Sequence, residues 1–147
     1  MMQRFFELGA LLDPRGRLSR AGYGRRLIRM LLAFIGLGSL SILLASLEAR
    51  FAALAILSTG IMGTAVLASV ATVQRLHDRD RTGWWLLPNI LVTLAGFAPI
   101  ETLADAYPVA VIAVTLALAG FSLWFLIETL GRRGTAGRNR YGPEPGR

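Results

Sequence analysis

Four long apolar runs, separated by short charged or turn-forming segments, decide what this chain of 147 residues can fold into. In helical form, about 17–25 apolar residues are needed to cross the ~30 Å hydrocarbon core of a bilayer. The runs lack the polar stripe, recurring every three to four residues, of a soluble amphipathic helix. They extend over residues 27–47, 51–73, 84–100 and 109–130. The pattern predicts an all-α, polytopic membrane protein, with a four-transmembrane-helix bundle as one domain over residues 1–147.

The positions of the arginines predict how these spans are oriented. All sixteen basic residues are arginine, and the net charge is +7. Seven lie between Arg4 and Arg29, three lie in the second loop and five in the tail 131–147, whereas the first loop holds only Arg50. The positive-inside rule therefore places the leader 1–26, the second loop and the tail in the cytoplasm. Because topology accounts for the charge, we expect no nucleic-acid binding.

The leader and the scarcity of cysteine and histidine support a few further predictions. The chain has no cysteine and a single histidine. A zinc site needs three or four ligands, so we predict neither a metal nor a cofactor. The first run is longer than a signal-peptide core and no small-residue cleavage site follows it, so the leader should be retained. Residues 3–12 fit either an interfacial helix or a frayed leader, and Ser19 is a good N-cap for a helix that begins near Arg20.

Residues 74–85, QRLHDRDRTGWW, concentrate charge between the second and third runs. Ionised groups at this density are too costly to place in hydrocarbon, so the segment is predicted to form a loop at the membrane surface. We expect its two aspartates to neutralise its three arginines and Gly83 to let the chain turn. Trp84 and Trp85 should anchor the following span among the lipid headgroups.

His77 and Asp78 are the one pair in this segment that resembles a general base and its orienting carboxylate. Adjacent residues on a helix diverge by about 100°, however, so the two side chains should not face each other. No nucleophile accompanies them, since Ser19 is better explained as a helix cap. We therefore predict no catalytic residue, and enzymatic lipid or phosphate chemistry through His77 and Asp78 is the weakest alternative.

The apolar runs contain few polar groups that could serve transport. No ionisable residue lies near the middle of a run, which argues against pumps, proton-coupled transporters and voltage sensors. Small residues recur every fourth position in the second run, in one row from Gly60 and another from Ala55, so this helix should be the packed centre of the bundle. Whether it packs against this chain or a second subunit is left open. The carboxylate of Glu128, near the end of the fourth run, should pair with a loop arginine or reach the headgroups.

The third run is the shortest, and Pro88-Asn89 lies one turn into it, followed by Gly96 and Pro99. Proline removes a backbone donor and loosens the preceding turn, so a kink is expected at Pro88. Two forms are compatible with this pattern. One is a kinked structural helix, and the other is a half-helix that lines a ligand cavity.

Three short motifs occur in order between the apolar runs. They are Gly-Arg-Leu-Ser-Arg at 16–20 followed by Tyr23, Arg-Leu-His-Asp at 75–78 with Gly-Trp-Trp at 83–85, and Gly-x-Asn-Arg-Tyr-Gly-Pro-x-Pro at 137–145. Together they resemble the domain-of-unknown-function 805 family of small bacterial inner-membrane proteins, from about Phe6 to Pro145. The resemblance implies a plasma-membrane location and brings no activity.

The sequence departs from the family pattern at a few positions. Gln74 stands where a second arginine is frequent, Asp80 stands where glycine is frequent, and Gly22 and Gly24 flank Tyr23 in place of bulkier residues. The departure at Asp80 puts a tight turn at that point in question.

With both termini and the second loop on one side, the three motifs should meet on one face. We predict that the tail folds back on the Arg-Leu-His-Asp motif and that Asp78 binds an arginine from residues 16–20. The members of the predicted binding cluster are Arg17, Arg20, Arg75, His77, Asp78, Arg81, Gly83, Trp84, Trp85, Asn139, Arg140 and Tyr141.

The leading functional hypothesis is a non-enzymatic scaffold or accessory protein of the inner membrane. Its arginine-rich face would contact anionic lipid headgroups or a protein partner, and a homo-oligomer fits the same features. The alternative is a transporter or small-molecule conduit built around the third span.

Overall fold

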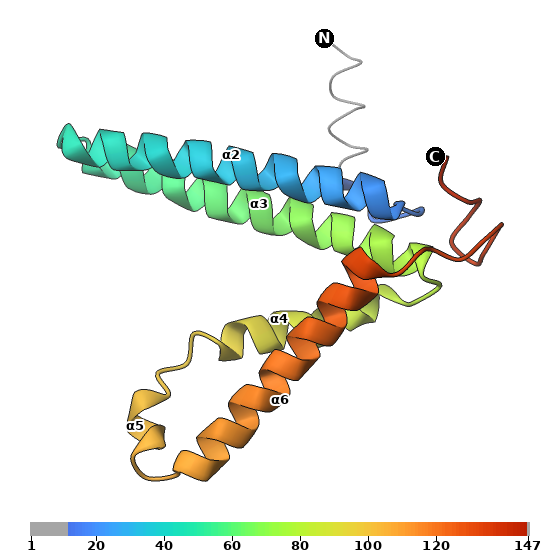
Figure 1. The fold of residues 1–147 in the computed structure, drawn as a ribbon. Coiled ribbons are helices and arrows are strands. Elements are labelled where there is room, and N and C mark those ends of the chain that lie inside the picture. Colours follow the sequence, from blue (N-terminus) through green and yellow to red (C-terminus); the bar gives the residue numbers. More distant parts are fainter. Residues whose placement is uncertain (1–11, 147) are drawn as a thin grey trace.

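The computed structural model describes residues 12–146, which form helices and turns without a β-strand (Figure 1). The interfacial helix predicted for residues 3–12 lies outside the described residues, apart from Leu12. The elements are α2 (Arg20–Ser46), α3 (Arg50–Asp78), the 3-10 helix η1 (Gly83–Trp85), α4 (Leu86–Ala95), α5 (Glu101–Ala104), α6 (Pro108–Leu126) and the π-helix η2 (Ile127–Gly131).

The first two helices form a long antiparallel hairpin. The helix α2 begins at Arg20, as predicted, because the Ser19 side chain accepts a hydrogen bond from the backbone N–H of Gly22 at 3.2 Å. At 27 and 29 residues, α2 and α3 are each about 40 Å long, which exceeds the hydrocarbon thickness of ~30 Å. Each helix is therefore long enough to extend beyond the hydrocarbon by one or more turns.

Small residues on α3 let α2 approach closely. A Cβ atom at Gly60 would lie 3.2 Å from Cδ1 of Leu37, and the Ser41 hydroxyl donates to the carbonyl oxygen of Ala53 at 2.8 Å. The row that contains Gly60 thus faces α2, so this row packs against a helix of the same chain. The other row faces outward, since Gly63 has open space around its Cα and Ala55 is exposed.

The third apolar run, predicted to be a span over residues 84–100, does not form one continuous helix. Its helical part, Gly83–Ala95, is about 20 Å long, which is shorter than the ~30 Å hydrocarbon core, and the chain continues through a turn and α5 before α6 begins. The break lies at the end of α4 rather than at Pro88, which occupies the first turn, where a helical N–H has no intrahelical partner. Pro99 disfavours the helical conformation for the residue before it and keeps the helix from continuing.

Among residues 12–146, three helices are long and apolar enough to cross a membrane: α2, α3 and the combined α6–η2 segment. The protein is therefore an all-α, multi-pass membrane protein with three long candidate spans and one shorter apolar helix. Large apolar side chains on the outer faces of these helices are exposed, for example Leu32, Leu54 and Leu116. Exposure of this kind is expected where lipid, rather than water, surrounds the helices.

The two arms of the molecule meet only at one end. In Figure 1 the α2–α3 hairpin and the α4–α6 arm diverge from a common corner, where the end of α3, η1, η2 and the tail come together. The predicted compact four-helix bundle is thus realised only at this corner. Its largest fully buried side chains are Arg75, Leu76 and Glu128, so charged groups rather than an apolar core hold the arms together.

Candidate functional site: an arginine–carboxylate cluster

The helix α3 continues into the first part of the segment that was predicted to be a loop. Gln74 to Asp78 form its last turns, and a left-handed residue, Asp80 with φ +56°, ends the turn that follows. Aspartate tolerates this conformation better than most residues, although glycine adopts it without strain. A tight turn therefore forms with aspartate at position 80, while Arg75 and Asp78 are fixed on the rigid helix.

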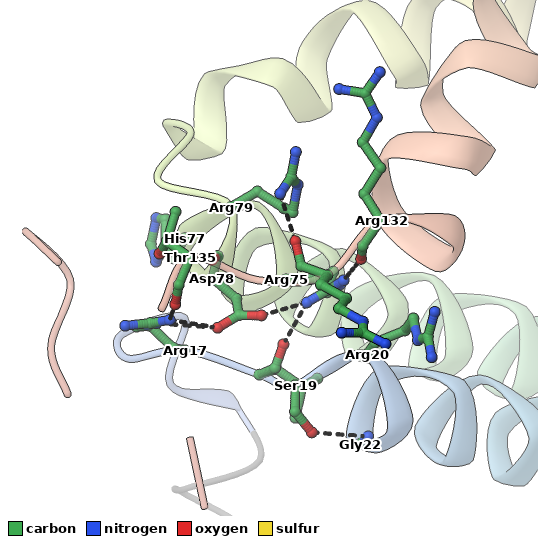
Figure 2. A network of polar contacts seen from close by, with 12 residues as sticks. Arg17, Ser19, Arg20, Gly22, Arg75, His77, Asp78, Arg79, Arg132 and Thr135 are labelled. Carbon is green, nitrogen blue, oxygen red and sulfur yellow. Dashed lines mark hydrogen bonds and ion pairs between the residues drawn. The ribbon is translucent and has the colours of Figure 1, made fainter. Parts of the chain in front are cut away.

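Asp78 lies at the centre of the cluster, between two guanidinium groups (Figure 2). Its Oδ1 is 2.9 Å from Nη2 of Arg17 and accepts a hydrogen bond from Nε at 3.0 Å, while its Oδ2 binds Arg75. The side chains of Arg17, Arg75 and Asp78 are only 1%, 0% and 4% exposed. The predicted ion pair between Asp78 and an arginine of residues 16–20 is confirmed.

The remaining donors of Arg75 reach the end of the fourth span. Its Nε donates to the carbonyl oxygen of Thr129 at 2.7 Å, its Nη2 donates to that of Arg132, and its Nη1 also reaches Leu18 at 3.4 Å. A guanidinium offers five donors in a planar fork, which suits it to several acceptors at once. Arg75 thereby joins α3 to η2, the leader and the tail.

Arg17 makes the matching connection from the leader to the tail. It donates to the carbonyl oxygens of Gly137 at 2.6 Å and Gly142 at 3.3 Å, and to that of Thr135. The backbone N–H of Thr135 in turn donates to the Asp78 carbonyl at 2.8 Å. These bonds satisfy carbonyl groups of an irregular tail that forms no helix of its own.

Side chains of the tail motif complete the contact with α3. The Asn139 amide donates to the carbonyl oxygen of His77 at 2.9 Å, and the Tyr141 ring stacks on the His77 imidazole with centroids 3.8 Å apart. Nδ1 of His77 lies 3.3 Å from the Gly16 carbonyl oxygen. All three sequence motifs therefore meet, as predicted.

A second carboxylate, Glu128, gathers a separate set of arginines. Its Oε1 is 2.7 Å from Nε of Arg81 and 3.2 Å from Nε of Arg79, and its Oε2 is 3.4 Å from Arg132. The side chain of Glu128 is 1% exposed. Its predicted pairing with a loop arginine is confirmed. The π-helical turn of η2 buries Glu128 and Thr129 together, although they are adjacent in sequence.

The expected neutralisation of the loop arginines by the loop aspartates is only partly correct. Asp78 pairs with Arg75, but Arg79 and Arg81 pair with Glu128. Asp80 instead pairs with Arg140 of the tail at 3.0 Å. Arg79 and Arg81 therefore pair with a carboxylate distant in the sequence and not with the aspartates of their own segment.

The other predicted members lie at the edge of the cluster. Arg20 donates to the Gly131 carbonyl at 3.1 Å, and the Arg81 guanidinium lies 5.5 Å from the ring centres of both Trp85 and Trp124. Trp84 is 76% exposed, as is expected of a headgroup anchor. Gly83 does not have a positive φ. A glycine fits at this position because a Cβ there would lie only 3.0 Å from the Val73 side chain.

Several members were absent from the predicted cluster, although the pairing of Glu128 with a loop arginine was expected. Arg79, Glu128, Arg132 and Thr135 supply ion pairs or hydrogen bonds to the cluster. Gly134 allows the tail to approach so closely that a Cβ would lie 2.0 Å from Oδ2 of Asp78. A glycine between the fourth span and the tail motif is the one signal that could have indicated this close approach.

The side chains of His77 and Asp78 bind different partners. The Asp78 carboxylate is held by Arg17 and Arg75, whereas the His77 ring contacts Tyr141 and Gly16. A carboxylate that orients a general base must bind the imidazole directly. The arrangement therefore stabilises the junction of four segments and lacks the contact that a catalytic pair needs.

A family model described as "Protein of unknown function (DUF805)" matches residues 11–143. No curated protein and no solved structure matches the chain. The matched range includes all the described members of the cluster.

Proposed function

Because the chain belongs to the DUF805 family, which brings no activity with it, we propose a role from the geometry of its arginines. The protein is a non-enzymatic scaffold or accessory protein of the bacterial inner membrane. Its arginine-rich corner faces the cytoplasm and contacts anionic lipid headgroups. The buried cluster holds the corner together, and an outer set of arginines makes the contact.

One observation carries this proposal, namely the division of the arginines into two sets. Arg17 and Arg75 are buried and satisfied by carboxylate and carbonyl groups. Arg25, Arg133 and Arg138 are exposed, and their side chains have no hydrogen bond or ion pair with any described residue. Exposed arginines beside a membrane surface attract anionic lipids, at about 1 kcal/mol per charge.

The orientation can be tested with reporter fusions. A periplasmic reporter fused after Asp105 should be active, and one fused after Arg140 should be silent, because the arginine-rich corner stays in the cytoplasm. The reverse pattern would place the corner on the opposite side and remove the basis for contact with the anionic inner leaflet.

The headgroup contact can be tested by measuring the lipids retained on the purified protein. Native mass spectrometry from nanodiscs of mixed phosphatidylglycerol and phosphatidylcholine should detect enrichment of the anionic lipid. The variant R25Q/R133Q/R138Q should lose much of this enrichment, whereas His77→Ala, which leaves every exposed arginine in place, should keep it. Equal retention of both lipids by the unaltered protein would refute the proposal, and co-purification of a protein in their place would favour a partner instead.

A conduit is the second candidate, and one observation favours it. A cavity of about 590 Å³ lies between α4, α5 and α6, beside the half-helix, and its lining includes Gly96, Tyr107 and Ser122. Broken helices that line cavities are frequent in transporters. A conduit should lose flux on Pro88→Ala or Asn89→Leu while its lipid enrichment stays unchanged. A scaffold should be indifferent to both changes.

An enzyme would behave differently from either. His77→Ala should then abolish turnover of a phosphate or lipid substrate without unfolding the protein. The scaffold proposal expects the same substitution to act only through the lost stacking on Tyr141.

A further inference from the structure

A pocket of about 270 Å³ lies between α2 and α3, away from the buried cluster. It is lined by Arg26, Arg29, Met30, Ala33, Thr64 and Leu67. Along α2, the residues from Arg26 to Ala33 extend over about 10 Å. The pocket therefore has a charged end and an apolar end, in the order in which a phospholipid presents its phosphate and its acyl chain.

The charged end of the pocket carries two positive charges that the described chain does not neutralise. Arg29 has no hydrogen bond or ion pair with any described residue. Arg26 donates one hydrogen bond to Oε1 of Gln74, at 2.7 Å, and this acceptor is a neutral amide. Arginine forms its strongest hydrogen bonds with carboxylates and phosphates, and the donors left over here are available to such an anion.

The position of Arg29 along α2 strengthens the need for an anion. The uninterrupted apolar part of α2 begins at Met30, and the helix from there to Ser46 extends over about 26 Å, close to the hydrocarbon thickness. Arg29 therefore lies where headgroups meet hydrocarbon. A guanidinium at this boundary is costly without a counter-ion, and lipid phosphate is the anion present at that depth.

The apolar end of the pocket distinguishes a lipid from a soluble anion. Met30, Ala33 and Leu67 offer hydrocarbon surface, and the Thr64 hydroxyl is already used, since it donates to the Gly60 carbonyl at 2.6 Å. Inorganic phosphate would use the arginines and leave this surface empty. An acyl chain attached to the phosphate would cover it.

We infer that this pocket binds one anionic phospholipid, with its phosphate between Arg26 and Arg29 and the start of an acyl chain along Met30, Ala33 and Leu67. The inference rests on the proposed function, because it assigns one defined site within the arginine-rich corner. It adds a stoichiometry, since the site holds a single lipid, whereas the outer arginines Arg133 and Arg138 attract headgroups through their charge.

The test compares two matched pairs of arginines by native mass spectrometry in nanodiscs of phosphatidylglycerol and phosphatidylcholine. In R26Q/R29Q, the one phosphatidylglycerol molecule that survives the highest activation energy should be lost, with binding about tenfold weaker. In R133Q/R138Q, which removes the same charge, that lipid should be kept. Retention in R26Q/R29Q together with loss in R133Q/R138Q would overturn the inference and leave the proposed function intact. Absence of anionic enrichment in the unaltered protein would refute both.

A second variant separates the acyl chain from the charge. Ala33→Phe fills the apolar end and leaves both arginines, so it should release the lipid while anionic enrichment at the outer arginines stays. Excess inorganic phosphate should fail to displace the lipid from the unaltered protein. Displacement by phosphate, or full retention in Ala33→Phe, would show that the pocket recognises a phosphate ion alone and would contradict the lipid assignment. Circular dichroism of each variant checks that the helices persist.

Discussion

At the residue scale, the fold depends on a few charged side chains that are buried away from water. Asp78 is shared by Arg17 and Arg75, and Glu128 by three further arginines. Desolvation of such groups is expensive, so their net contribution to stability is small, but removal of one partner leaves a buried charge uncompensated. The cluster therefore selects one arrangement of the segments more than it adds free energy.

The pair Arg17–Asp78 should show this asymmetry in a double-mutant cycle. Arg17→Ala and Asp78→Ala should each lower the free energy of unfolding in detergent by about 3 kcal/mol or more, and the double variant should lose less than their sum. The exposed pair Arg50–Glu48, with side chains 76% and 77% exposed, is the control and should give about 0–1 kcal/mol. Additive effects for Arg17 and Asp78 would show that the ion pair does not couple the leader to α3.

At the element scale, close packing and helix breaks decide where each helix goes. The row around Gly60 lets α2 lie against α3, and in lipid such van der Waals contact drives association, since apolar surface alone gives no preference. The end of α4 at Ala95 shortens the third run, and the wider turn of η2 points Glu128 inward. Each feature directs a polar group or a helix toward the common corner.

Substitution of two glycines of α3 should separate the inner face from the outer face. Gly60→Leu should push Leu37 away, destabilise the hairpin and lower the melting temperature in detergent, because a Cβ alone already lies 3.2 Å from that side chain. Gly63→Leu adds the same atoms on the other face, where no atom lies within 4 Å of a Cβ, and should be tolerated. Equal destabilisation by the two would mean that both faces are packed.

At the scale of the whole molecule, two arms diverge from one polar corner (Figure 1). The contacts between the arms lie at the end of α3, at η1 and η2, while their far ends separate. The tail closes this corner by accepting hydrogen bonds from Arg17 and Arg79. An irregular segment of the chain thus links the two helical arms through hydrogen bonds.

Removal of the tail should therefore loosen the arms without unfolding them. A chain that ends at Gly134 loses the acceptors at Thr135, Gly137 and Gly142, so α3 and η2 should become more sensitive to protease at their junction. Helical circular dichroism should stay nearly unchanged, because the helices are complete without the tail. A control that ends at Pro145 keeps these acceptors and should resist protease like the full chain.

The sequence by itself determined the class of the molecule and much of its chemistry. Apolar run length predicts membrane helices, and the start of α2 follows from Ser19. The meeting of the three motifs was also predictable, since arginine-rich segments share one side of a membrane. These features depend on the composition of each segment, because that composition decides whether the segment lies in lipid or at the membrane surface.

Only the tertiary structure decided which charges pair and how the arms lie. The extension of α3 to Asp78 turned a predicted loop into helix, so Arg79 and Arg81 face Glu128 instead of the nearby aspartates. The early end of α4 reduced four predicted spans to three long ones and a short helix. Pairing and helix length depend on distances between segments far apart in the sequence, and no local pattern carries those distances.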